Sequence, residues 1–209
     1  MSPRDTNARG RLLDAALQVI RQQGYAATTV DDLCAAAGVT KGAFFHHFAS
    51  KEALAVAAAE HWSATTGALF AAAAYHDVAD PLERVLAYLD LRAALVDRVD
   101  RDPSLYSCVA GTMAQETFAT APAIRQACGA SILGHAQTLE PDFEAVLAAY
   151  PTDADVTARS LAVHTQAVLQ GAFVVSKAAD DPQLVHDAID HLRRYLRLLF
   201  TPSTERTAR

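Results

Sequence analysis

Two short helical patterns lie next to each other in the stretch TTVDDLCAAAGVTKGAFFHHFASKEAL, which begins at Thr28. The first covers residues 30–37 and the second residues 41–48, and the tight turn AGVT joins them. Thr28 or Thr29 can cap the first helix, because an Asp follows each of them at the N-cap-to-N3 spacing. Thr40 can cap the second helix in the same way. Two capped helices joined by a short turn with a glycine predict a helix-turn-helix.

The rest of the chain also favours helix, so we predict an all-α fold. Ala, Leu, Arg and Gln are frequent, and no segment alternates between apolar and polar residues as a strand does. Pro141 must kink or split the long helix in which it lies. Apolar spacing, capping residues and Pro or Gly breaks predict helices over residues 6–23, 30–37, 41–48, 51–74, 81–99, 105–120, 122–150, 153–179 and 181–200.

Composition and charge exclude several classes of protein. Half of the residues are hydrophobic, which is enough for a sizeable core. No run of about 18 uncharged apolar residues occurs, so we predict no membrane span. The N-terminus lacks the apolar region of a secretory signal, which makes a cytoplasmic location the expectation. Residues 1–62 carry six Lys or Arg and six Asp or Glu, whereas the net charge of −6 comes from the remainder. The N-terminal region therefore repels an anionic partner less than residues 63–209 do.

The second helix of the pair has one face that could read DNA. If Phe44 and Phe48 point inward, the outward residues are Lys41, Gly42, Ala43, Phe45, His46 and His47. Lys at a helix N-terminus is unfavourable for the helix dipole, unless an anion lies in front of it. From the pattern alone, two interpretations remain open: a DNA-binding helix, or a packed helical hairpin with a solvated Lys and His face.

The same residues resemble the N-terminal domain of the TetR family of bacterial transcriptional regulators. The resemblance covers residues 12–54, where the caps, turn, glycine, aromatic and Lys positions agree in order and spacing. It implies a three-helix DNA-binding head with a helix-turn-helix in residues 1–50, followed by a larger helical domain in residues 51–201. That domain would bind an effector and dimerise, with residues 51–74 as a linking helix. We expect residues 202–209 to form a disordered tail.

The resemblance also implies roles for single residues. Thr28, Thr29 and Thr40 would bind phosphate, and Lys41 would reach a base edge. Gly42, Ala43 and Phe45 would lie against bases, His46 and His47 would reach phosphate or bases, and Lys51 would neutralise a phosphate. Two positions depart from the family pattern. Phe45 replaces the usual Tyr and lacks its hydroxyl, and Ala43 replaces Thr or Ser.

The C-terminal half is expected to form a homodimer through the last two helices. Val163, Ala167, Gln170, Val174 and Ala178 recur at helical spacing, and Ile189, Leu192, Leu196 and Leu199 make a matching stripe. An ordinary intramolecular core stripe is the alternative. The family resemblance further implies an effector cavity among the middle helices. Its candidate lining residues, polar and apolar, are Leu105, Tyr106, Met113, Gln115, Glu116, Phe118, Leu133, His135, His164, Gln166, Leu169, Gln170 and Phe173.

Other functions have weaker support in the sequence. It contains no Gly-rich phosphate loop, nucleophile elbow or HExxH, so we expect no enzyme and no cofactor. Cys34, Cys108 and Cys128 are widely spaced and form no CxxC, which favours buried thiols. The expected function is therefore a ligand-responsive repressor. It would bind a palindromic operator in double-stranded DNA as a homodimer and be released by a small, largely apolar effector. The alternative is a metal- or redox-responsive regulator that uses Cys108, Cys128 or His residues.

Overall fold

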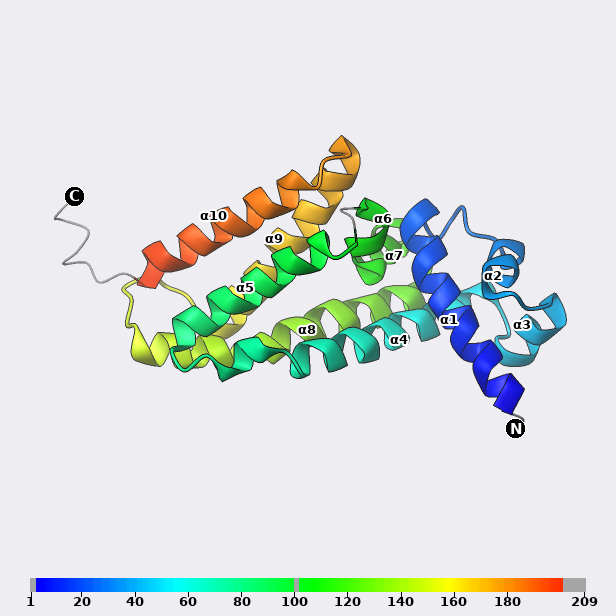
Figure 1. Cartoon of the computed structure of the whole chain (residues 1–209), viewed down its shortest axis with the longest axis horizontal. Helices are drawn as coiled ribbons and strands as arrows, with labels where there is room; N and C mark the ends of the chain where they lie inside the picture. The colour runs from blue at the N-terminus through cyan, green and yellow to red at the C-terminus, as the bar shows by residue number, and fades with distance from the viewer. Residues whose placement is uncertain (1–2, 100–101, 201–209) are drawn as a thin grey trace. The chain divides into compact units, whose positions relative to one another are not determined.

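The structure, a computed structural model, is helical throughout the residues that it describes, which are 3–99 and 102–200 (Figure 1). No strand occurs in these residues, which confirms the predicted all-α class. The helices are α1 (Pro3–Gln23), α2 (Val30–Ala37), α3 (Lys41–His47), α4 (Lys51–Ala71), the 3-10 helix η1 (Ala74–Asp77), α5 (Pro81–Asp97), α6 (Pro103–Tyr106), α7 (Val109–Thr117), α8 (Pro122–Ala149), α9 (Ala158–Ala179) and α10 (Gln183–Phe200).

The chain divides into two compact units. The first contains Met1–Ala71 and Ser107–Ile132, and the second contains Ala72–Tyr106 and Leu133–Arg209. The first unit therefore combines α1–α4 with α7 and the first part of α8. Sequence reasoning places a domain boundary at residue 50, whereas α4 packs with α1 and α7 in this first unit. The functional division at residue 50 stays a prediction, and the tail at 202–209 lies outside the described residues.

The first unit has one continuous hydrophobic core. The apolar face of α1 packs on α2, α3, α4 and α7. Leu12 and Ile20 from α1, Leu33 from α2, Phe44 from α3 and Leu54 from α4 are all fully buried in this core. Burial of side chains of this size contributes about 1.5–3 kcal/mol each. The core therefore holds α2 and α3 on α1, and it leaves the outer face of α3 in solvent.

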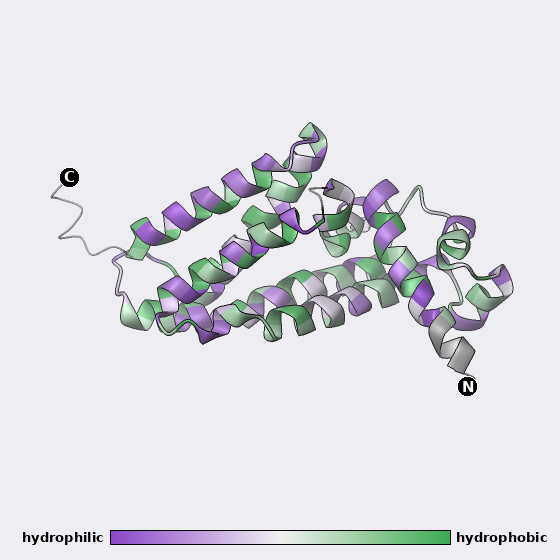
Figure 2. Cartoon of the chain, viewed as in Figure 1, coloured by the Kyte–Doolittle hydropathy of each residue, from purple (hydrophilic) through white to green (hydrophobic). Residues whose placement is uncertain are grey.

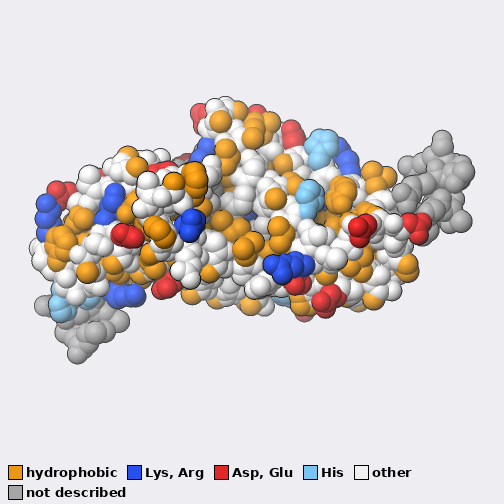
Figure 3. All heavy atoms as spheres, turned by 180° about the vertical axis from the view of Figure 1, so that it is seen from behind, with side chains coloured by type: hydrophobic (Ala, Val, Ile, Leu, Met, Phe, Trp, Pro, Cys, Tyr) orange, Lys and Arg blue, Asp and Glu red, His pale blue; other side chains and the backbone are white. Residues whose placement is uncertain are grey.

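The second unit pairs α9 with α10 and packs α5 against α10. Hydrophobic and hydrophilic residues alternate along α10, as a helix with one buried face requires (Figure 2). Its buried residues include Ile189, Leu192 and Leu196, three members of the stripe predicted to form a dimer interface. For these residues the intramolecular alternative is correct, because they are buried within the single chain. Elsewhere, hydrophobic side chains reach the surface in patches between charged ones (Figure 3).

Several helix boundaries differ from the sequence-based prediction. The helix expected from residue 153 begins at Ala158, because Thr157 and Ser160 form a reciprocal capping box. The helix expected over residues 105–120 is divided into α6 and α7. Helix α8 continues through Pro141, so of the two predicted outcomes, a kink or a split, the split does not occur. Pro141 is exposed, and water can therefore solvate the carbonyl that loses its usual N–H donor.

None of the described helices combines the length and the apolar character that a membrane crossing requires.

Candidate nucleic-acid interface

Local hydrogen bonds define the two helices of the helix-turn-helix. Thr29 caps α2: its Oγ1 accepts from the Asp32 N–H at 3.1 Å, and the Asp32 carboxylate accepts from the Thr29 N–H at 2.9 Å. Gly38 ends α2 in the left-handed conformation, with φ of 61°. Thr40 then caps α3, because its Oγ1 accepts from the Ala43 N–H at 3.2 Å. The predicted caps and the turn are thus present, and they fix α3 at the surface.

The outer face of α3 carries most of the residues that sequence reasoning assigns to DNA. Lys41, Gly42, Phe45 and His46 are exposed, and Phe45 exposes 55% of its surface. Ala43 and His47 are half-buried. The Nε2 atom of His47 is buried and has no hydrogen-bond partner among the described residues, so it does not point to solvent. The face therefore presents a cation, an aromatic ring, an imidazole and small residues that allow close approach.

Lys41 is held by an ion pair that DNA can replace. Its Nζ lies 2.8 Å from Asp31 Oδ1, and both side chains are exposed, by 60% and 69%. The hydrogen bond and the charge of Asp31 raise the pKa of Lys41, which therefore stays charged. An exposed ion pair of this kind contributes little to stability. The ammonium group can therefore exchange Asp31 for a phosphate or a guanine edge at small cost.

Two of the predicted phosphate-binding residues have other partners in the structure. Thr28 is only 1% exposed, its hydroxyl donates to the Gly24 carbonyl at 2.6 Å and its N–H donates to the Tyr25 carbonyl at 3.2 Å. Lys51 is half-buried and its Nζ donates to the carbonyls of Tyr25 and Thr28. These side chains stabilise the loop between α1 and α2. Thr40 is exposed at the N-terminus of α3, whereas the exposed Thr29 donates both its hydroxyl, at 2.7 Å, and its N–H, at 2.9 Å, to the Asp32 carboxylate.

The candidate effector residues are divided between the two units. The candidates on α7, and Phe118 directly after it, belong to the first unit. There, Met113 is buried in the core, and Gln115, Glu116 and Phe118 are exposed. The others belong to the second unit. There, Leu105 and Gln170 are half-buried, and His164 is exposed with its ring 5.4 Å from that of Tyr195. The effector cavity predicted for the whole set stays a prediction.

Part of the predicted set does come together in the second unit. The His135 Nε2 lies 2.9 Å from the hydroxyl of Tyr88, and Gln166 donates to that hydroxyl at 3.1 Å. The guanidinium of Arg92 lies 5.7 Å from the ring centroid of Phe173 and donates to the same hydroxyl at 3.4 Å. Burial, and then the charge of Arg92, lower the pKa of His135 to about 4. The imidazole is therefore neutral at pH 7.

A second predicted pair also meets in this unit. The hydroxyl of Tyr106 hydrogen-bonds to that of Ser176 at 2.5 Å, and its ring lies 6.1 Å from that of Phe173. Sequence reasoning missed Tyr88, Arg92 and Ser176. Tyr88 and Arg92 lie four residues apart on α5, a spacing that places them on one face of the helix, and this was the available signal.

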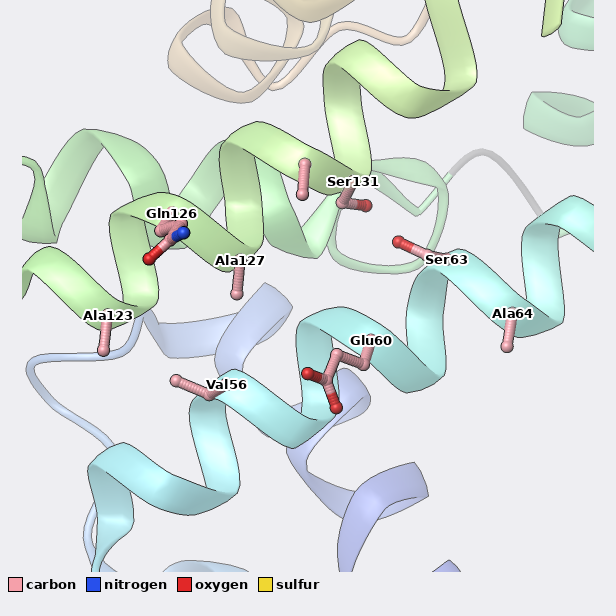
Figure 4. Close-up of a pocket in the computed structure, with 9 residues that line it drawn as sticks. Val56, Glu60, Ser63, Ala64, Ala123, Gln126, Ala127 and Ser131 are labelled. Atoms are coloured by element: carbon pink, nitrogen blue, oxygen red, sulfur yellow. The ribbon is translucent and has the colours of Figure 1, made fainter. Parts of the chain in front are cut away.

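A hollow of about 740 Å³ opens between α4 and α8 within the first unit (Figure 4). Its walls are mostly small side chains, and among the described residues that line it Glu60 alone is charged. Sequence reasoning did not identify it, because alanines that line a hollow look the same in sequence as alanines that favour helix. The lining residues are Val56, Glu60, Ser63, Ala64, Ala123, Gln126, Ala127, Ala130 and Ser131.

The arrangement of the cysteines and histidines bears on the alternative of a metal or redox centre. Within residues 3–99 and 102–200, no group of three or more His, Cys, Asp or Glu side chains is arranged to hold a metal ion. All three cysteines are free thiols. Burial, and then the neighbouring Cys108, raise the pKa of Cys128 to about 12. Cys128 is therefore a protonated, poorly nucleophilic thiol at neutral pH.

An all-helical chain with a capped helix-turn-helix at its surface has the architecture of a helix-turn-helix DNA-binding protein. The sequence model of the bacterial regulatory proteins of the tetR family matches residues 12–58. A second model, the C-terminal domain of LmrA/YxaF-like transcriptional regulators, matches residues 81–191, which is just over half of the chain. The chain belongs to the TetR family, a family of transcriptional regulators, and the predicted membership is confirmed.

Individual relatives agree with this assignment. The transcriptional regulator YerO of Bacillus subtilis is 38% identical over 52 residues, which are 25% of this chain and 18% of YerO. The transcriptional repressor KstR2 of Mycobacterium tuberculosis is 48% identical over 44 residues, which are 21% of this chain and 22% of KstR2. The matched segments thus span about a fifth of these relatives. A TetR-family regulator from Agrobacterium tumefaciens has the same fold, with a TM-score of 0.80 at 20% identity over 94% of this chain and all of that chain.

Proposed function

We propose that this TetR-family regulator represses transcription by binding a palindromic operator as a homodimer, and that a small effector releases it. The observation that carries the proposal is the outer face of α3, where Lys41, Gly42, Phe45 and His46 are exposed beside the capped turn. A helix of this kind fits the major groove of double-stranded DNA. The exposed Thr29 and Thr40 are at the N-termini of α2 and α3, where backbone N–H groups favour phosphate.

The homodimer is supported by the outer face of α9. The stripe Val163, Ala167, Val174 and Ala178 is exposed along its length in the single chain. Tyr195 and Leu198 add exposed apolar surface on α10. Large apolar side chains exposed at regular helical spacing mark a surface that another molecule covers. A second copy of the chain would cover this stripe with its own, and would bring two recognition helices to one palindrome.

Operator binding can be tested directly by fluorescence anisotropy. The duplex would contain the region upstream of the protein's own gene, and a scrambled duplex would serve as the control, each at two salt concentrations. We expect tight binding to the first duplex only, weakening as salt rises because phosphate contacts release counterions. Equal weak binding to both duplexes would contradict specific repression at this site.

Lys41 gives a prediction about sequence reading. We expect Lys41→Ala to weaken operator binding by roughly 10- to 100-fold and to relax the preference at one base pair, as the loss of a base-edge contact does. Binding to each single-base variant of the operator would be measured by anisotropy. Arg9→Ala, on α1, is a control for the loss of one positive charge. Equal losses for specific and scrambled DNA in Lys41→Ala would show that Lys41 contacts only phosphate.

The effector is proposed to bind in the hollow between α4 and α8. A wall of small side chains suits an apolar body, and the carboxylate of Glu60 favours a ligand with one positive charge. A ligand in this hollow would press on α4, which packs against α1 of the head. It would release the operator to the extent that it binds the displaced state more tightly.

A small aromatic cation tests the proposed ligand class. Benzyltrimethylammonium would be titrated calorimetrically, with uncharged benzyl alcohol as the comparison. Because the carboxylate is exposed, we expect Glu60→Gln to weaken binding of the cation by only about two- to fivefold and to leave the alcohol unaffected. Glu52→Gln, on the same helix but outside the hollow, should change neither. Equal affinity of wild type and Glu60→Gln for the cation would refute the role of Glu60.

A further inference from the structure

The loop between α1 and α2 is held from outside the helix-turn-helix. Gly24 ends α1 with φ of +86°, and its N–H donates to the carbonyl of Ile20 at 2.9 Å. The loop then leads directly into Thr29, the N-cap of α2. Any change in the path of this loop therefore changes the position at which α2 starts.

Glu116, on α7, binds the backbone of this loop with both of its carboxylate oxygens. Its Oε1 accepts from the N–H of Tyr25 at 3.1 Å, and its Oε2 accepts from the N–H of Ala26 at 2.7 Å. A Cβ at position 24 would lie 2.5 Å from Oε1, so only glycine leaves room for the carboxylate. Ionised acceptors form stronger hydrogen bonds than neutral ones. The contact thus joins residues about 90 positions apart in the sequence.

Lys51, at the start of α4, binds backbone carbonyl groups of the same loop. Its Nζ donates to the carbonyl of Tyr25 at 2.9 Å and to that of Thr28 at 2.8 Å. It also lies 4.3 Å from the centroid of the Tyr25 ring. A carboxylate therefore satisfies the N–H groups of the loop while an ammonium group satisfies its carbonyl groups. The loop is fixed from two helices that are not part of the helix-turn-helix.

We propose that Glu116 is a positioning residue for operator binding: through the α1–α2 loop, its carboxylate holds α2 in the place from which α3 reads DNA. The proposal rests on the proposed DNA-binding function and goes beyond it. Glu116 lies in the segment that matches the C-terminal regulator domain, so α7 and the head share this contact. A displacement of α7 that breaks the two hydrogen bonds would free the loop and lower operator affinity.

The sign of the effect separates this role from simple electrostatics. Removing a carboxylate from a DNA-binding unit makes it less negative, which by itself would strengthen binding to any DNA. The positioning role predicts the opposite for the operator. We therefore expect Glu116→Gln and Glu116→Ala to bind the operator about tenfold more weakly while scrambled DNA is bound equally well or slightly better. Glutamine cannot replace the carboxylate in this role, because its NH₂ group would face one of the two backbone N–H donors.

The experiment measures DNA affinity and amide hydrogen exchange on the same variants at a temperature where circular dichroism shows each to be folded. In both Glu116 variants, the Tyr25 and Ala26 amides should exchange about tenfold faster or more. Thr120→Ala, at an exposed position shortly after α7, is the matched control and should match wild type in both measurements.

Each outcome has a defined meaning. Faster exchange with unchanged operator affinity would overturn the positioning role and leave Glu116 as a structural contact. Unchanged exchange would show that the carboxylate does not hold the loop. If wild type itself does not distinguish operator from scrambled DNA, the proposed function fails, and the exchange data still report whether Glu116 holds the loop.

Discussion

Val174→Asp is expected to separate the proposed homodimer into monomers and to weaken operator binding by about 100-fold or more. Val174 exposes 44% of its surface and lies at the centre of the apolar stripe on α9. In a symmetric dimer each stripe faces its own copy, so the substitution places two carboxylates in an apolar interface. A monomer then binds one half-site at a time and loses the gain from linked binding.

Sedimentation velocity and operator anisotropy would measure the two effects. Leu133→Asp is the matched control, because Leu133 is another exposed apolar residue of the second unit but lies on α8. We expect this control to remain dimeric and to bind the operator normally. A dimeric Val174→Asp protein with normal affinity would place the interface elsewhere on the chain.

The second large effect concerns pH and His135. Its pKa is about 4 in the folded chain, against 6.5 for an unperturbed histidine, because burial and then the Arg92 charge oppose protonation. In the unfolded chain His135 is therefore protonated below about pH 6.5, whereas in the folded chain it is protonated only below about pH 4. Over this window we expect His135 to lower the free energy of unfolding by about 3 kcal/mol as pH falls, with no further loss below it.

Urea denaturation at a series of pH values would measure this loss. His135→Gln removes the titrating group, so its free energy of unfolding should fall less between pH 7 and pH 4 than that of wild type. His46→Gln, which replaces an exposed histidine of the first unit, is the control for the substitution itself. Parallel pH profiles for wild type and His135→Gln would contradict the burial of a neutral imidazole beside Tyr88.

The parts of the site that depend on near neighbours in the chain could be predicted from sequence. Thr29 and Thr40 cap α2 and α3 as their spacing predicts, because an N-cap needs only its own side chain and an N–H three residues later. The predicted start of α9 was wrong for a related reason. The cap at Thr157 lies inside a segment that also favours helix, and sequence alone does not show which candidate cap forms.

The parts that depend on distant neighbours could not be predicted. Helices α9 and α10 carry similar apolar stripes, yet Ile189 and Leu192 are buried within the chain whereas Val174 is exposed. Periodicity gives the face of a helix but not the partner that covers it. Glu116, a predicted effector residue, accepts hydrogen bonds from the backbone N–H groups of Tyr25 and Ala26, which the sequence did not indicate. No local pattern indicates an acceptor that lies about 90 residues from its donors.

The contact of Glu116 with the loop also limits how this protein can be recombined with its relatives. A hybrid made by joining residues 1–50 to the C-terminal part of another regulator would carry the glycine at position 24 without the carboxylate that it accommodates. The junction would also fall directly before Lys51, which binds the loop carbonyls. The smallest portion that can be transplanted with its loop intact therefore includes α4 and α7, two segments that are separated in the chain.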